Sequence, residues 1–491
     1  MKYDVIIIGS GLGGLECAHI LSRAGMNVLL LERGTQAGGC LLSYKRLGLA
    51  FDTGFHYVGG LYEGQSLHAI FEYLGLLRLP WERLDTYFDR VTIEDRTFAF
   101  AQGYDRFVRT LAEDFPAERE ALNRYVNMLK RIEEQQFDML NPQSGKPSFP
   151  FKLFETSAYQ YLTETFRDPL LINVLCGTSL KMELRRESLP LFTFAHGNSS
   201  FIESSWRLKG DGSLIVNSLV DDIRRHGGEI LCNSEVQVLV EKDGKLVHAV
   251  CSNGESYEGN IFISNVHPAV TCDLVKQSDR MKKIYRNRIA GLENTFGMFT
   301  VSLCIRSRTL KYFNWNQYVY DQPNVWTFYL ENSPVSGVLV SCRIPEDGSE
   351  YVQQVDLLTP MLWSKCEPWN MTEVGRRGEE YKAMKKRVAE ECIILAERFI
   401  PGLRDMITGY YTSTPLTYRD YTLTPEGTAY GLRKDFRDPV MTVLSPRTPI
   451  PNLFLTGQNL MLHGLHGVTM TTLFTCAEIL GKEHIWNIVK N

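Results

Sequence analysis

The sequence lacks the features of a membrane-spanning or disulfide-rich protein. No stretch of about twenty uninterrupted apolar residues occurs, so we expect no helix that crosses a bilayer. The 11 cysteines are scattered from Cys17 to Cys476 without a C-x-x-C pair or a clustered metal-ligand spacing. Scattered thiols favour a reducing compartment over a disulfide framework. We therefore predict no metal site.

An excess of either charge is also missing. Lys and Arg number 53, Asp and Glu number 57, and the formal net charge is −4. This balance gives no electrostatic reason to bind nucleic acid, so we expect a hydrophobic small molecule as the partner. The N-terminal stretch has no basic leader or cleavage site, which predicts a cytoplasmic protein. Peripheral contact with the cytoplasmic face of a membrane stays open, as does the oligomeric state.

The first thirty residues contain the strongest local pattern. A β-branched run, Val5–Ile8, predicts a strand buried on both faces, as in a parallel sheet. Gly9, Gly11 and Gly14 follow in G-x-G-x-x-G spacing, and a helical pattern then leads to a second strand at Asn27–Glu32. This order of strand, glycine turn, helix and strand predicts one βαβ unit of a dinucleotide-binding fold.

Each of these residue types has a separate chemical use. Gly9 permits the tight turn, Gly11 lets a pyrophosphate approach the backbone, and Gly14 lets the helix pack close to the sheet. The helix N-terminus offers free N–H groups and the positive end of a dipole. Glu32 can accept hydrogen bonds from both ribose hydroxyls and would repel a 2′-phosphate. The site is therefore predicted to hold a dinucleotide without that phosphate.

Two more parts of the chain carry patterns of the same domain. Glu235–Glu241 and Leu246–Ser252 alternate around a Lys-Asp-Gly turn, which predicts a hairpin. Ile450–Leu460 supplies one more short apolar strand. At 491 residues the chain is too long for one ordinary core. We predict a nucleotide domain of residues 1–75, 205–267 and 415–491, and a substrate-binding or lid domain of residues 76–204 and 268–414.

Five motifs resemble a known family. In chain order they are GSGLGGLECAHILSRAG, LLLERGTQAGGC, GLAFDTGFHYVGG, GTAYG and IPNLFLTGQNL with GLHGV after it. Together they resemble the carotenoid desaturase and isomerase superfamily of FAD enzymes, and within it the retinol saturase branch. The resemblance implies an α/β fold: a Rossmann-like FAD-binding domain of the glutathione-reductase or amine-oxidase type, with an inserted α+β substrate domain.

The same resemblance implies FAD as cofactor and a set of residues that hold it. The glycine turns would expose backbone N–H groups to the pyrophosphate, and the C-terminal turn would point amides at the flavin ring. The implied FAD-binding residues are Gly9, Gly11, Leu12, Gly13, Gly14, Glu32, Arg33, Gly38, Gly39, Val236, Gly457, Gln458, Gly467 and Val468.

The resemblance also implies an activity. Reduced flavin would pass a hydride from N5 to one carbon of a polyene double bond, and a positioned acid would protonate the neighbouring carbon. His56 and Tyr57 would lie near the isoalloxazine ring as the proton donors, and Tyr430 would border the substrate. For His463 and His466 a structural role is the better interpretation. The reductant would be NAD(P)H or another carrier.

Three alternatives stay open at this point. One flavin pocket supports hydride flow in both directions, so a desaturase or an isomerase fits the same residues. An amine oxidase of related architecture would need an amine site, for which the sequence offers no clear aromatic pair. A non-catalytic escort of prenylated proteins shares the fold, and the intact glycine set argues against it.

Overall fold

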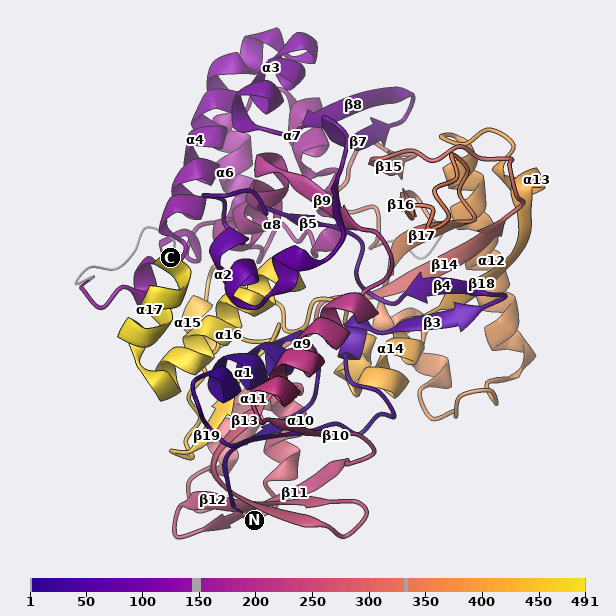
Figure 1. Cartoon of the computed structure of the whole chain (residues 1–491). Helices are drawn as coiled ribbons and strands as arrows, with labels where there is room; N and C mark the ends of the chain where they lie inside the picture. Colours follow the sequence, from indigo (N-terminus) through magenta and orange to yellow (C-terminus); the bar gives the residue numbers. More distant parts are fainter. Residues whose placement is uncertain (1, 144–151, 331–333, 491) are drawn as a thin grey trace.

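The computed structural model describes residues 2–143, 152–330 and 334–490 of the chain (Figure 1). Within these residues, two seven-stranded sheets form the centres of two layered regions. The first sheet lies at the bottom of Figure 1 near the N-terminus, and the second lies on the right, beside a group of helices at the upper left. The candidate site is built where the two regions meet.

The first sheet has parallel strands at its centre. Its order is β10-β2-β1-β13-β12-β11, with β19 also paired to β13. β1 pairs in parallel with both β2 and β13, and β13 pairs in parallel with β19. The strands are β1 (Lys2–Ile8), β2 (Val28–Leu31), β10 (Glu229–Leu231), β11 (Val236–Lys242), β12 (Lys245–Cys251), β13 (Ser256–Ser264) and β19 (Leu453–Leu455).

Apolar side chains cover both faces of this sheet. Val5 and Ile7 join one core cluster, whereas Ile6 and Ile8 join another on the opposite face. This double burial is what the β-branched run of β1 predicts. The helices around the sheet are α1 (Leu12–Arg23), α2 (His68–Tyr73), α9 (Ser213–Arg225), α10 (Pro268–Leu274), α11 (Lys283–Ala290), α16 (Gly464–Leu480) and α17 (Lys482–Lys490).

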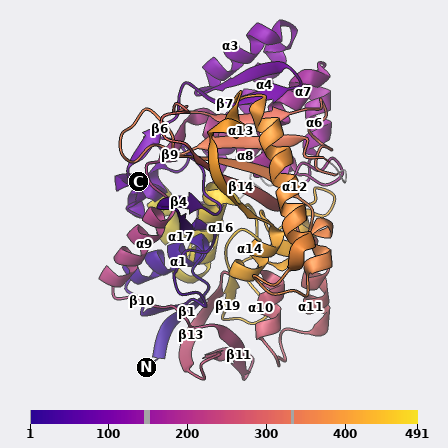
Figure 2. The same ribbon diagram turned by 90° about the vertical axis from the view of Figure 1, so that its right-hand side faces the viewer.

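The second sheet is mostly antiparallel and follows the order β18-β14-β17-β16-β15-β7-β8. Only β7 and β15, among the pairs of this sheet in the described residues, run in parallel. Figure 2 shows α12 across one of its faces. The elements of this layer are β7 (Tyr87–Ile93), β8 (Arg96–Ala101), β14 (Gly297–Ile305), β15 (Asn316–Tyr320), β16 (Gly337–Cys342), β17 (Gln354–Met361), β18 (Ile407–Ser413), α12 (Gly378–Glu397) and α13 (Leu403–Met406).

A helical cap covers the other face of the second sheet (Figure 1). Its helices are α3 (Tyr104–Asp114), α4 (Arg119–Gln135), α6 (Ala158–Thr165), α7 (Pro169–Cys176) and α8 (Leu191–Glu203). None of the helices in the described part of the chain is long and apolar enough to cross a bilayer. The remaining elements connect the layers: β3 (Ser43–Arg46), β4 (Leu49–Asp52), β5 (Val58–Gly59), β6 (Trp81–Arg83), β9 (Ser205–Leu208), α14 (Pro415–Thr422) and α15 (Pro439–Thr442).

The predicted hairpin of the nucleotide region is confirmed. β11 and β12 pair antiparallel, with Lys242 opposite Lys245 and irregular register at two points. The first sheet also draws its strands from three separated stretches of the chain, as residues 2–31, 229–264 and 453–455. The exact division into two domains at the boundaries given above stays a prediction.

Candidate functional site

The glycine turn after β1 is tightly closed. Gly9 has a φ of +91°, a conformation that favours glycine. A Cβ atom added to Gly14 would lie 2.1 Å from the carbonyl oxygen of Gly9. Helix α1 begins directly after Gly11, which has no side chain to cap it. In the first turn of α1, the N–H groups of Leu12 and Gly13 are left for a ligand, as phosphate-binding turns require.

Glu32, at the end of β2, ties this turn to the next loop. Its carboxylate accepts hydrogen bonds from the N–H groups of Ser10 at 3.0 Å and Gly34 at 2.6 Å, and from the Ser10 hydroxyl. The Ser10 hydroxyl in turn accepts from the Gly38 N–H at 3.1 Å. Glu32 thus lies at the carboxyl edge of the sheet, where its oxygens face the loops that a ribose would contact.

Three distant turns meet at van der Waals distance. A Cβ atom on Gly39 would lie 3.0 Å from the Cα of Gly11. A Cβ atom on Gly13 would lie 3.1 Å from the Cα of Gly457, which follows β19. The structure therefore brings five of the predicted glycines together with Gly14 in one small volume. Side chains at these positions would collide with the neighbouring turns, so glycine is what lets the turns approach one another.

Asn265 belongs to this site and was not predicted. It follows β13 directly, and its amide lies against Gly11 and Gly13 of the glycine turn. With its oxygen turned to the loop, Asn265 accepts from the N–H groups of Gly11 at 3.2 Å and Gly14 at 3.3 Å. The only sequence signal was a polar residue at the end of an apolar strand, which is too common to single out.

The other predicted cofactor residues lie at several places around the turn. Leu12 opens α1, and Val236 opens β11, two positions after Ser234, whose N–H donates to the Glu32 carbonyl at 2.8 Å. Gln458 follows Gly457, and its Cγ lies against Gly431. Gly467 and Val468 lie in the first turns of α16, whose N-terminus also has no side-chain cap. The Arg33 guanidinium donates to the carbonyl of Asp420 in α14, so its contact with a pyrophosphate stays a prediction.

A dinucleotide fits what these residues present. The turn offers backbone N–H groups and almost no Cβ atoms, and neither α1 nor α16 begins with a residue whose side chain caps it. Backbone donors and the positive ends of helix dipoles suit phosphate oxygens and the electron-rich edge of a ring. The carboxylate of Glu32 at the strand end suits a ribose diol.

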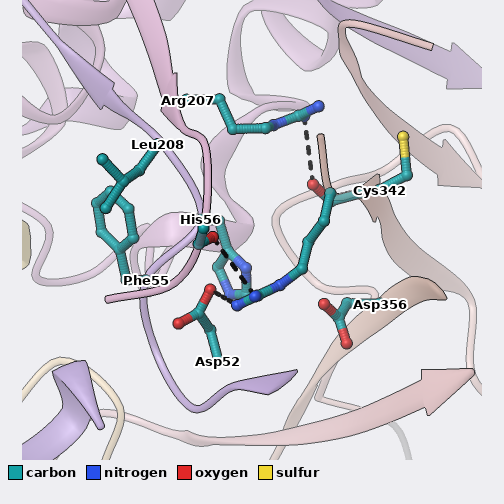
Figure 3. A pocket seen from close by; sticks show the side chains of 10 residues that line it. Asp52, Phe55, His56, Arg207, Leu208, Cys342 and Asp356 are labelled. Carbon is teal, nitrogen blue, oxygen red and sulfur yellow. Dashed lines mark hydrogen bonds and ion pairs between the residues drawn. The ribbon is translucent and has the colours of Figure 1, made fainter. Parts of the chain in front are cut away.

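His56 lies in a small cavity between the Phe51–Gly60 segment and the second sheet (Figure 3). Asp52, Arg207, Arg343 and Asp356 line the same cavity, and Arg343 forms an ion pair with Asp52. Burial and the charge of Arg207 lower the pKa of His56 to about 4. The imidazole is therefore neutral near pH 7. A neutral imidazole is too weak an acid to serve as the proton donor.

Tyr57 enters a different network, although it is the next residue. Its hydroxyl donates to Asp89 at 3.0 Å and contacts the hydroxyl of Tyr318 at 2.9 Å. Lys181 Nζ donates to the Tyr57 oxygen at 3.4 Å and lies 4.2 Å from the centre of the Phe201 ring. Sequence gave no reason to connect Lys181 with Tyr57, because 124 positions separate them.

Burial sets the protonation of this group. It raises the pKa of Tyr57 well above its usual value, helped by the charge of Asp89. It also raises the pKa of Asp89 and lowers the pKa of Lys181 to about 8. Asp89 keeps its position because Asn316 donates to it at 2.9 Å. Lys181 can therefore lose its proton near neutral pH, whereas the hydroxyl of the neighbouring Tyr57 stays protonated.

Tyr430 packs against the start of α16. Its hydroxyl donates to the carbonyl of Leu180 at 2.5 Å, and its ring centre lies 4.7 Å from that of His463. His463 Nε2 contacts the carbonyl of Lys181 at 3.0 Å. Tyr430 and His463 thus hold the backbone of the segment that carries Lys181. This arrangement gives His463 a structural contact with the backbone of the segment that carries Lys181.

His466 also has a structural partner. Its Nε2 donates to Gln136 Oε1 at 2.7 Å, and Gln136 donates to the buried carboxyl of Glu133 at 3.3 Å. Burial lowers the pKa of His466 well below its usual value. The imidazole is therefore neutral and connects α16 to the helical cap.

Comparisons with known proteins agree with this geometry. The human all-trans-retinol 13,14-reductase is 26% identical over 543 residues, which cover 100% of this chain and 87% of that protein. The chloroplastic prolycopene isomerase 2 of an Oncidium hybrid cultivar is 25% identical and covers 88% of this chain and 75% of its own length. The solved structure of cyclohexylamine oxidase from Brevibacterium oxydans IH-35A superposes with a TM-score of 0.62 at 13% identity, over 100% of this chain and 99% of that one, which shows a common fold. A model of the flavin-containing amine oxidoreductases matches residues 12–480. The chain therefore belongs to the flavin-containing amine oxidoreductase family, with FAD as its cofactor.

Proposed function

We propose that this flavoenzyme saturates a carbon–carbon double bond of a hydrophobic polyene, a retinoid or a related lipid. One observation carries the proposal: similarity to a protein named for reduction of the 13,14 bond of retinol extends over the whole chain. The backbone cradle around Gly13 and Gly457 supports the cofactor half of the proposal.

The reaction needs a hydride and a proton. When bound and reduced by NAD(P)H or another two-electron carrier, FAD supplies the hydride to one alkene carbon. The chain must then supply a proton to the neighbouring carbon and keep water out of the site. Of the residues predicted for this role, only Tyr57 has both a proton at neutral pH and a basic group beside it.

We assign the proton transfer to Tyr57 and its resupply to Lys181. The Tyr57 hydroxyl turns from Asp89 to the substrate and gives its proton to carbon, and Lys181 Nζ passes a proton to the Tyr57 oxygen across their 3.4 Å contact. Asp89 and Tyr318 hold the phenol in place from the other side. Lys181 suits this task because burial brings its pKa to about 8, close to the working pH.

His56 and Tyr430 take other roles in this proposal. His56 is neutral and faces the charged cavity of Asp52 and Arg207, so it orients the loop under the flavin. The Tyr430 hydroxyl donates a hydrogen bond to the Leu180 carbonyl, and Tyr430 forms a wall of the site. Both are positioning residues.

A single-turnover experiment tests the function. The holoenzyme is reduced chemically without oxygen, mixed with all-trans-retinol in D₂O, and the product is analysed by mass spectrometry. Saturation predicts a gain of two hydrogens with solvent deuterium at the protonated carbon, and with a second deuterium at the other carbon to the extent that the flavin N5–H has exchanged with D₂O. A product that has lost two hydrogens, or an unchanged retinoid with the flavin still reduced, contradicts the proposal.

Isomerisation of a polyene is the second candidate, because the Oncidium relative is named for it. The same experiment separates the two. An isomerase would return a polyene of unchanged mass with a changed double-bond geometry, and it would not consume the reduced cofactor.

A further inference from the structure

A second small cavity lies between helix α8 and the segment that carries Tyr430 and His463. Its free volume is about 20 Å³, enough for one oxygen-sized group and too small for a ring. Ser188 and Thr193 line it from the helical cap. Tyr430 and His463 line it from the side of α16, so the cavity borders the region where the flavin is predicted to lie.

The charged groups of this cavity already have hydrogen-bond partners. Arg433 donates to both carboxylate oxygens of Glu183, at 2.5 and 3.1 Å, and is neutralised by it. Lys434 Nζ donates to the neutral carbonyl oxygens of Thr442 at 3.0 Å and Asn459 at 2.7 Å. Burial lowers the pKa of Lys434 to about 7, so this lysine is only partly charged near neutral pH.

Two hydroxyls of the wall have no partner. Ser188 Oγ and Thr193 Oγ1 are buried, in side chains 4% and 5% exposed, and neither has a hydrogen-bond partner among the described residues. Thr193 lies in the first turn of α8, where such a hydroxyl can bond a preceding carbonyl, yet it does not. The Ser188 carbonyl accepts from the Phe436 N–H at 2.9 Å, which fixes this backbone. Buried hydroxyls in proteins are almost always bonded, so a guest is expected to bond these two.

We propose that this cavity binds the uncharged terminal oxygen of the polyene, a hydroxyl or carbonyl group, through Ser188 and Thr193. Each of the two hydroxyls can donate and accept, which matches both an alcohol and a ketone. The oxygen-bearing end of the substrate then lies beside Tyr430 and His463, close to the reacting double bond. This inference rests on the proposed function and adds the chemical class of the end that is recognised.

Binding to the holoenzyme tests the inference. The dissociation constants of all-trans-retinol and of the hydrocarbon with hydrogen in place of its hydroxyl are measured by equilibrium dialysis. The unmodified enzyme is expected to prefer the alcohol by about tenfold, the value of one to two good hydrogen bonds. In the double variant Ser188→Ala with Thr193→Val, the ratio falls to about one because only the alcohol loses affinity.

Two variants serve as controls. Thr193→Ser keeps a hydroxyl and is expected to retain most of the preference. Thr163→Val removes a hydroxyl from α6 that bonds the carbonyls of Tyr159 and Gln160, and it is expected to change neither ligand. Flavin content and melting temperature show that each variant is folded.

The outcomes separate this inference from the proposed function. If both ligands bind the unmodified enzyme equally well, the hydroxyls serve an internal water and the inference is wrong while the function stands. If the double variant keeps the preference, the oxygen is recognised elsewhere and the inference is also wrong. If neither ligand binds an enzyme that retains its flavin, the proposed function fails and the inference fails with it.

Discussion

The two sides of the site recognise their ligands by different means. On the nucleotide side, backbone atoms of Gly11, Gly13, Gly39 and Gly457 come together, and the absence of side chains makes the site. On the substrate side, the working atoms belong to side chains such as Tyr57, whose partners come from strands and helices far along the chain.

Because of this difference, mutations on the two sides of the site should have different effects. A backbone cradle tolerates no added atom, because the contacts that close it involve carbonyl oxygens and Cα atoms that cannot move away. A side-chain network tolerates small changes of shape but loses its chemistry when one proton is removed. Mutations should therefore abolish cofactor binding on the nucleotide side and change rates or pH dependence on the other.

The largest effect is expected from Gly14→Ala. The new methyl group would lie 2.1 Å from the Gly9 carbonyl oxygen, so the turn or α1 must shift. We expect a protein without bound FAD, destabilised by about 3 kcal/mol or more, as flavin absorbance and thermal melting would show. Gly409→Ala in β18 is the control, since a Cβ there meets nothing within 4 Å. A yellow Gly14→Ala protein with normal stability would refute the closed cradle.

Tyr57→Phe and Lys181→Met probe the substrate side. Each removes a member of the proton path, so we expect product formation to fall by about 100-fold or more with normal flavin content. The rate of the unmodified enzyme should fall as pH rises through about 8, because Lys181 then loses its proton. Lys181→Met should not show this fall.

Tyr62→Phe is the matched control for the tyrosine. Tyr62 lies shortly after the segment that carries Tyr57, is 43% exposed, and accepts from Arg83 at its hydroxyl. Its loss should leave the rate unchanged. Full activity of Tyr57→Phe across the pH range would show that another group supplies the proton.

Asn265→Ala tests a side chain on the backbone side. The variant loses the two bonds to the N–H groups of Gly11 and Gly14, each with a net value of about 1 kcal/mol. We expect FAD to bind about tenfold more weakly, measured by titration of the apoprotein. Asn260→Ala, at an exposed position of the same strand β13, should bind FAD normally. Equal affinities for the two variants would mean that the glycine turn needs no support.

The smallest effect is expected at Glu133 in the helical cap. Burial and the neighbouring Glu203 raise the pKa of Glu133, so the folded protein holds a proton that the unfolded chain releases. Stability should therefore fall as pH rises from ~5 to ~7, through the range between the unfolded and the folded pKa. In Glu133→Gln the free energy of unfolding should depend less on pH, by about 1 kcal/mol for each pH unit of this range, which thermal melting at several pH values would show. Glu134→Gln, exposed on the same helix, should melt like the unmodified protein at every pH.

The predictions from sequence were most accurate where recognition depends on the backbone. The strand, turn and helix around Gly9 follow from local spacing, because only glycine permits that turn and the run after it has helical periodicity. The hairpin of β11 and β12 was also predicted, since its turn lies between its two strands. Asn265 was missed because its partners are backbone atoms about 250 positions away.

What the sequence by itself determined is the cofactor side: local glycine spacing and β-branched runs dictate a turn at the end of a parallel strand, whatever the rest of the chain does. Only the tertiary structure decided the chemistry of the other side. It directed the side chains of His56 and Tyr57 to different sets of neighbours, brought Lys181 to Tyr57, and buried Ser188 and Thr193 around one cavity. The physical reason is that the pKa of a side chain and its hydrogen bonds depend on neighbours in space, and burial is a property of the packed layers.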